Sequence, residues 1–174
     1  GSAYYMRGEG NIVEDCYFHH IDYTGSSLRG PMVTFLNYGK DAVFTRNTVH
    51  TTGASETVRY LDPVEVSYNN ISNTGLVHDD GAISQQGNNS VDGTVIHHNW
   101  FHDSVKHAIR FDGEENDPDR SGVNGIVHHN VIWNVRRGVM AKGNDHKIYN
   151  NTIFNCEQNE IAVINSEYSD PPGG

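Results

Sequence analysis

The sequence predicts an all-β protein in which one short unit of strands recurs along the chain and stacks on its neighbours. Three observations support this fold class. A ten-residue phrase occurs six times, further β-like runs lie between its copies, and no amphipathic helical pattern separates them. Since an α/β repeat needs a helix between its strands, the pattern favours a coiled chain of stacked parallel strands, a solenoid.

The repeated phrase has a polar residue at its centre and apolar residues three positions before and two positions after it. The central positions are separated by 31, 22, 30, 31 and 21 residues. The copies read NIVEDCYFHH at 11–20, AVFTRNTVHT at 42–51, VEVSYNNISN at 64–73, TVIHHNWFHD at 94–103, GIVHHNVIWN at 125–134 and HKIYNNTIFN at 146–155.

Alignment of the six copies gives one polar column and two apolar columns. The polar column is Cys16, Asn47, Asn69, Asn99, Asn130 and Asn151. The apolar column before it is Val13, Phe44, Val66, Ile96, Val127 and Ile148. The apolar column after it is Phe18, Val49, Ile71, Phe101, Ile132 and Ile153. Strands in neighbouring coils lie about 4.8 Å apart, so we expect the apolar columns to fill the interior.

The Asn column is predicted to form an internal ladder at a bend, with each side-chain amide bonded to its neighbour in the next coil. Asn also tolerates the left-handed backbone that a sharp bend needs. Four residues after the centre, each copy has a polar or turn-forming residue: His20, Thr51, Asn73, Asp103, Asn134 and Asn155. The phrase is therefore interpreted as one rung of a stack.

Second β-like runs lie between the copies and read PMVTFLN, GAISQ, HAIRFD, GVMAK and EIAVIN. We align four of them through Ile83, Ile109, Met140 and Ala162. This register pairs Arg110 with Ser84 and Ala141. If Ile109 and Phe111 point inward, alternation makes Arg110 and Asp112 point outward.

Composition limits the partners. The chain has 22 acidic and 12 basic residues, which argues against a nucleic-acid partner because phosphate binding needs clustered Lys and Arg. No apolar run approaches 18 residues, so no membrane span is expected.

The length fits a single domain over residues 1–174. The opening Gly-Ser and the lack of a capping helix leave open that these residues are an excerpt of a longer solenoid, with further coils or domains adjoining it. The two cysteines, Cys16 and Cys156, fit no metal-binding spacing, and we expect buried thiols rather than a disulfide.

The segments HHNVIWNV, KIYNNTIFN and AIRFDG resemble the right-handed parallel β-helix repeat proteins, a group that includes polysaccharide lyases and several glycoside hydrolase families. The resemblance covers residues from about 9 to 165. It implies a right-handed parallel β-helix of about six to seven coils. It also implies a secreted or cell-surface protein with a polysaccharide groove along one outer face and acid–base residues on adjacent coils.

The leading hypothesis is a glycoside hydrolase. Asp79 and Asp80 would lie at the head of one strand, and His107, Arg110 and Asp112 on the next coil. Carboxylates on adjacent coils would lie about 5–6 Å apart, which is near the separation in retaining glycosidases, and their repulsion would raise one pKa. Asp-Gly is also an ordinary turn dipeptide, so a purely structural role stays open. Candidate substrate-binding residues are Ser84, Gln86, Arg136 and Lys142.

A second hypothesis is a polysaccharide lyase. β-Elimination on a uronate needs cations to neutralise the carboxylate and a base to remove the neighbouring proton. The candidate residues are Lys106, His107, Arg110, Arg136, Arg137 and Lys142. A third hypothesis is a non-catalytic fibre or adhesin in which stacking is itself the function.

An acidic loop follows the HAIRFD run. Its carboxylates suit a Ca²⁺ ion, although a solvated loop is the alternative; the candidate ligands are Asp112, Glu114, Asp117 and Asp119.

Histidines recur at equal positions of the repeats and form three columns. One contains His97 and His128, and a second contains His98 and His129. The third contains His19, His50 and His102. We interpret these columns as structural ladders rather than zinc sites. Four aromatic residues flank the Asn column, and some are candidates for a sugar-stacking platform: Trp100, Trp133, Tyr149 and Phe154.

Overall fold

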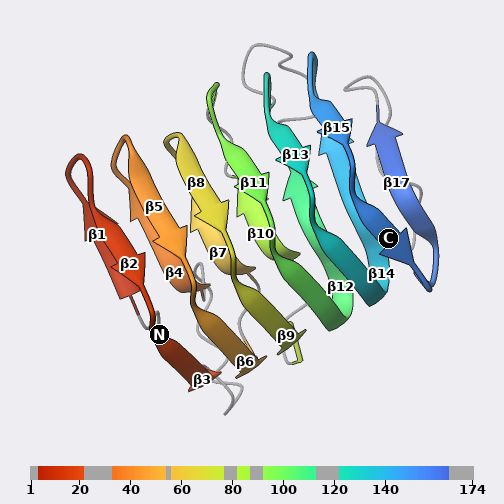
Figure 1. The fold of residues 1–174 in the computed structure, drawn as a ribbon, viewed down its shortest axis with the longest axis horizontal. Coiled ribbons are helices and arrows are strands. Elements are labelled where there is room, and N and C mark those ends of the chain that lie inside the picture. The colour runs from red at the N-terminus through yellow and green to blue at the C-terminus, as the bar shows by residue number, and fades with distance from the viewer. Residues whose placement is uncertain are drawn as a thin grey trace.

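The computed structural model describes residues 4–21, 33–53, 56–76, 82–86, 92–112 and 122–164. Within these ranges every regular element is a β-strand, and the strands form two parallel sheets. The described part of the chain also contains no helix that is long and apolar enough to span a membrane. Figure 1 shows the repeats side by side, from the red N-terminal strands to the blue C-terminal strands. The predicted all-β class is therefore confirmed.

The first sheet has six strands, one from the beginning of each repeated phrase. In spatial order they are β15 (Lys147–Tyr149), β13 (Ile126–His128), β11 (Val95–His97), β8 (Val64–Ser67), β5 (Ala42–Thr45) and β2 (Ile12–Glu14). All pair in parallel, and their register places the predicted first apolar column in line from Val13 to Ile148.

The second sheet has eleven strands in two arms. One arm contains β3 (Tyr17–Ile21), β6 (Thr48–Thr52), β9 (Asn70–Thr74) and β16 (Thr152–Phe154). The other contains β1 (Tyr4–Arg7), β4 (Val33–Tyr38), β7 (Glu56–Tyr60), β10 (Ala82–Gln86) and β17 (Asn159–Ile164). Two long strands take part in both arms: β12 (Trp100–Phe111) and β14 (Val131–Lys142). The second predicted apolar column, from Phe18 to Ile153, lies in register along the first arm.

The Asn column joins the repeats as predicted. The side-chain oxygens of Asn47, Asn69, Asn99, Asn130 and Asn151 each accept a hydrogen bond from the backbone N–H of the same position one repeat earlier, at 2.8–3.0 Å. Their side-chain nitrogens donate to backbone carbonyls of the preceding repeat, also at 2.8–3.0 Å. Asn99 and Asn69 are at most 2% exposed, so the ladder satisfies backbone groups that water cannot reach.

The bends require a left-handed backbone, but not at the ladder residue itself. The positive φ angles, between 53° and 56°, occur one position earlier, at Asp15, Arg46, Tyr68, His98, His129 and Asn150. The predicted turn column has the same conformation throughout, with φ between 51° and 58° at His20, Thr51, Asn73, Asp103, Asn134 and Asn155. Each phrase is thus a short strand, a corner, a second strand and another corner.

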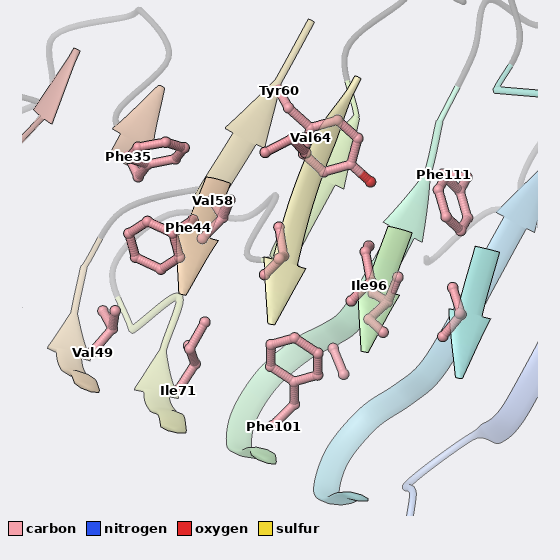
Figure 2. Packing of buried hydrophobic residues seen from close by; sticks show 14 of the residues in the cluster. Phe35, Phe44, Val49, Val58, Tyr60, Val64, Ile71, Ile96, Phe101 and Phe111 are labelled. Carbon is pink, nitrogen blue, oxygen red and sulfur yellow. The ribbon is translucent and has the colours of Figure 1, made fainter. Parts of the chain in front are cut away.

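The core lies between the sheets. Figure 2 shows Phe44 and Ile96 from the six-stranded sheet, Val49, Ile71 and Phe101 from one arm of the other sheet, and Phe35, Val58 and Phe111 from its second arm. All eight side chains have no exposed surface. Stacked apolar columns therefore supply the burial that a single repeat cannot provide alone.

Three expectations differ from the structure. Ile109 pairs with Val139, and Arg110 with Met140 and Gln85, so the register of the second runs was wrong by one residue there, although Met140 does pair with Ala162. The error has a visible cause, because β12 and β14 are in irregular register between Ser104 and His107.

The strands β1 and β7 were not predicted either. The segment Glu56–Tyr60 is ETVRY, whose polar residues hide the alternation expected of a strand. Cys16 is exposed rather than buried, because the first repeat is at the edge of the six-stranded sheet and of one arm; both cysteines are free thiols.

Replacing Asn99 with Ala should lower the free energy of unfolding by about 3 kcal/mol, because the buried N–H of Asn69 and the carbonyl of Val66 lose their partners. Urea unfolding followed by circular dichroism measures the change. The matched control is Asn159→Ala, which makes the same change at an exposed position of β17. The control should lose less than about 1 kcal/mol. Equal losses in the two variants would contradict the role of the ladder.

Candidate functional site

Charged side chains lie close together along the C-terminal halves of β12 and β14. Register pairs His107 with Arg137, and Arg110 with Met140, while Lys142 ends β14. Of the predicted hydrolase and lyase residues, this brings together His107, Arg110, Asp112, Arg137 and Lys142. We call these five residues the β12–β14 charge cluster.

Asp112 is enclosed by cations. Its carboxylate lies 2.8 Å from Arg110 Nη2 and 3.1 Å from Lys142 Nζ, and its side chain is only 16% exposed. The two cations are covered to a similar degree. Because the carboxylate is neutralised by two partners on adjacent strands, it links β12 to β14 as a partly buried ion triad.

His107 lies at the centre of the positive charge and is 6% exposed. Burial, followed by the positive charges of Arg110, Arg137, Lys106 and Arg136, lowers the pKa of His107 to about 3. The ring is therefore neutral near pH 7 and can accept a proton or a hydrogen bond.

Several buried polar atoms of this region have no hydrogen-bond partner within the described residues. They are the Nε atoms of Arg59, Arg110 and Arg137 and the Nδ1 atom of His107. Arg59 lies on β7, two strands from β12, and forms an ion pair with Glu56 at 3.4 Å. Three guanidinium N–H groups that lack partners are suited to an anionic group with several acceptor oxygens.

Most of the other predicted site residues lie outside the side chains that the structure describes. Asp79, Asp80, Glu114, Asp117 and Asp119 lie outside the described residues. Ser84 and Gln86 belong to β10, where the structure describes the backbone and not these side chains. Arg136, predicted to bind substrate, is on β14 one residue before Arg137. The carboxylate pair of the hydrolase hypothesis and the Ca²⁺ ligand set therefore stay predictions.

No group of three or more His, Cys, Asp or Glu side chains in the described ranges is arranged to hold a metal ion. The one described member of the predicted Ca²⁺ set, Asp112, has Arg110 and Lys142 against its oxygens. A cation at this carboxylate would have to displace both of these partners.

A second surface lies on the other arm of the sheet. Trp100, Val131, Trp133 and Phe154 line an open hollow of about 310 Å³. The rings of His102, Trp133 and Phe154 come from three successive repeats and stack nearly parallel, at interplanar angles of 4° and 6° and centroid distances of 4.2 and 6.1 Å. Trp100 and Phe154 are 56% and 48% exposed. We call Trp100, Trp133 and Phe154 the aromatic strip.

The sequence indicated the members of the aromatic strip but not their arrangement. Trp133 and Phe154 share one column with His102, whereas Trp100 shares a column with Val131 and Thr152. Tyr149, the fourth predicted aromatic, is instead on the six-stranded sheet, where it stacks on His128 at 5.1 Å. The position within the phrase distinguishes Tyr149 from Trp100, Trp133 and Phe154. Tyr149 precedes the first corner of its phrase, whereas the other three residues follow the first corner of theirs.

A scan against protein-family models, a search of curated proteins and a search of solved structures each returned no match to this chain.

Acid should destabilise the protein partly through His107. The folded pKa is about 3 and the ordinary value is 6.5, so the unfolded chain binds more protons between these two values. Stability then falls as pH falls through this window, by about 2 kcal/mol from His107 between roughly pH 7 and 4.5. Urea unfolding at the two pH values should show a smaller acid loss for His107→Gln than for the wild type. An identical acid loss in both proteins would show that His107 is not held neutral by the fold.

Proposed function

We propose that the protein is a secreted, polysaccharide-binding right-handed parallel β-helix, and that the aromatic strip holds the glycan. The observation that carries this proposal is the open apolar hollow that Trp100, Trp133 and Phe154 line, with Trp100 and Phe154 56% and 48% exposed. Pyranose rings have one apolar face, and such faces pack on aromatic rings with the sugar hydroxyls left in water.

The repeat geometry favours an extended polymer over a compact ligand. Neighbouring strands are about 4.8 Å apart, so equivalent side chains recur at that spacing along the stacking direction. A glycan chain lying along the strip would meet Trp100, Trp133 and Phe154, which come from three successive repeats. The hollow is shallow and open, as expected for a chain that binds from the side rather than a small molecule that is enclosed.

A second proposal concerns cleavage. Among the described residues, cations outnumber carboxylates in the β12–β14 charge cluster, and its one carboxylate is already paired. This composition favours β-elimination on an acidic polysaccharide over hydrolysis by a pair of carboxylates. The guanidinium groups of Arg110 and Arg137, whose positive charges act on His107, would bind a uronate carboxylate and stabilise the negative charge that develops next to it.

In such a reaction His107 is the candidate base. It would remove the proton from the carbon beside the carboxylate. A double bond would form between that carbon and its neighbour as the bond from the neighbour to the glycosidic oxygen breaks, and the leaving oxygen would take up a proton from the protonated His107 or from water. A bound uronate adds a negative charge next to the ring, which opposes the cationic neighbours and raises the proton affinity of His107 when substrate is present.

The aromatic strip can be tested by intrinsic fluorescence. The chain has two Trp residues, and both belong to the strip, so emission reports on it directly. Titration with a panel of neutral and acidic polysaccharides should change the emission for at least one of them. Trp100→Thr should weaken that binding about tenfold, because stacking contributes roughly 1 kcal/mol or more.

The matched control is Tyr17→Thr, an exposed aromatic in the same column as Trp100 at the first repeat. It should leave the affinity unchanged. If no polysaccharide changes the emission, or if both variants weaken binding equally, the strip is not the binding surface.

Cleavage is tested by incubating the protein with uronate polymers and recording the ultraviolet absorbance of the unsaturated product. Activity should be lost in His107→Gln and kept in Lys147→Gln, which removes a cation from the six-stranded sheet. New reducing ends without an unsaturated product, lost in Asp80→Asn, would instead support the glycoside hydrolase. Binding without any cleavage would leave a non-catalytic adhesin.

A further inference from the structure

The two phrases TVIHHNWFHD and GIVHHNVIWN each contain adjacent histidines that neither proposed surface uses. In both, the first His ends a strand of the six-stranded sheet and the second occupies the left-handed corner, with φ of 55° at His98 and 54° at His129. This change of backbone conformation turns the two rings nearly perpendicular, at 88° in each pair. Their Nδ1 atoms then lie 2.8 Å apart in both pairs.

The two pairs stack on each other. His97 lies over His128 with ring centroids 5.0 Å apart and planes at 7°, and His98 lies over His129 at 5.0 Å and 2°. Tyrosines extend both stacks, because Tyr68 packs on His98 at 4.9 Å and Tyr149 on His128 at 5.1 Å. The four imidazoles are therefore held in fixed orientations by their neighbours.

A carboxylate sets the tautomer of one ring. Glu65 Oε1 lies 3.2 Å from His97 Nε2, on the far side of the ring from His98. An Nε2–H that donates to Glu65 leaves the Nδ1 of His97 unprotonated, so it accepts a hydrogen bond from His98 Nδ1–H. A metal ion can replace that proton when His98 takes the tautomer protonated on Nε2, and a carboxylate orients metal-binding histidines in this way.

We propose that the His97–His98 and His128–His129 pairs are chelating sites for a divalent transition-metal ion that prefers square-planar or tetragonal nitrogen ligands, such as Cu²⁺ or Ni²⁺. Two nitrogens 2.8 Å apart, each about 2.0–2.1 Å from one ion, subtend about 85° at that ion. That angle suits neighbouring positions of a square, whereas the tetrahedral angle that Zn²⁺ prefers would need the nitrogens farther apart.

The same geometry recurs in two successive repeats, since the Nδ1 atoms are 2.8 Å apart in both pairs. Each pair supplies two protein ligands, and the described residues offer no cluster of three, so solvent completes the coordination. Binding is then exchangeable, and it lies beside the aromatic strip, because His98 and Trp100 line one hollow.

The test uses the tag-free protein of residues 1–174 and CuCl₂, followed by calorimetric titration and electron paramagnetic resonance. Wild type should bind Cu²⁺ with a spectrum that shows nitrogen ligands. The double variant His98→Asn/His129→Asn should bind the first equivalent of Cu²⁺ with an affinity at least about tenfold lower than that of the wild type. Asn is chosen because Asn150 occupies the same left-handed corner in the next repeat, so the backbone is retained. Glu65→Gln should also weaken binding, by about tenfold, through loss of orientation of His97.

The control is His20→Asn. His19 and His20 form a third adjacent pair, with Nδ1 atoms 2.9 Å apart, but they lie on β3 and not on the six-stranded sheet that carries Glu65, His97 and His128. This variant should bind the first equivalent of Cu²⁺ with the affinity of the wild type. Unaltered Cu²⁺ affinity in His98→Asn/His129→Asn, or loss of the first equivalent in His20→Asn alone, would overturn the proposal. Equal melting temperatures of the variants confirm that any loss is local.

Discussion

The hydrogen bonds of the Asn ladder fix the register on which every other column depends. Each ladder side chain bonds to a backbone N–H and to a backbone carbonyl of the preceding repeat, so a shift of one residue would break several bonds in a dry interior. In parallel sheets a shift of one residue also moves a whole set of side chains to the opposite face. The ladder therefore sets both what is buried and what the outer surface presents.

The corners beside the ladder have the same backbone conformation in every repeat but carry different side chains. Their left-handed backbone costs roughly 1–2 kcal/mol for a residue with a side chain. Yet the corner before the ladder accepts Arg46, Tyr68 and His98 as well as Asn150. The surrounding hydrogen bonds impose the conformation, so the residue type is not chosen by the backbone alone. The corner therefore accepts different side chains in different repeats, and in two successive repeats that side chain is a histidine, His98 or His129.

Much of the fold could be predicted because it is periodic. The apolar columns through Phe44 and Phe101 and the ladder through Asn99 recur at equal positions, and equal positions of a stack must meet. The register of Arg110 could not be predicted, because the chain between the two halves of β12 and β14 is irregular and no periodic residue crosses it. The strand β7 was missed for a similar reason, since Glu56 is buried by its ion pair with Arg59 rather than by apolar character.

The same distinction applies to the sites. Sequence indicated which residues carry charge near His107, but the ion triad of Asp112 depends on which cations lie within 3.1 Å, and that follows from strand register. An overall charge of −10 disfavours an anionic ligand. Charges farther away than about 8 Å are screened at physiological ionic strength, however, whereas partly buried groups are screened much less. The local excess of guanidinium groups around His107 therefore outweighs the distant acidic surface for a ligand that reaches it, and the acidic surface would oppose only its approach.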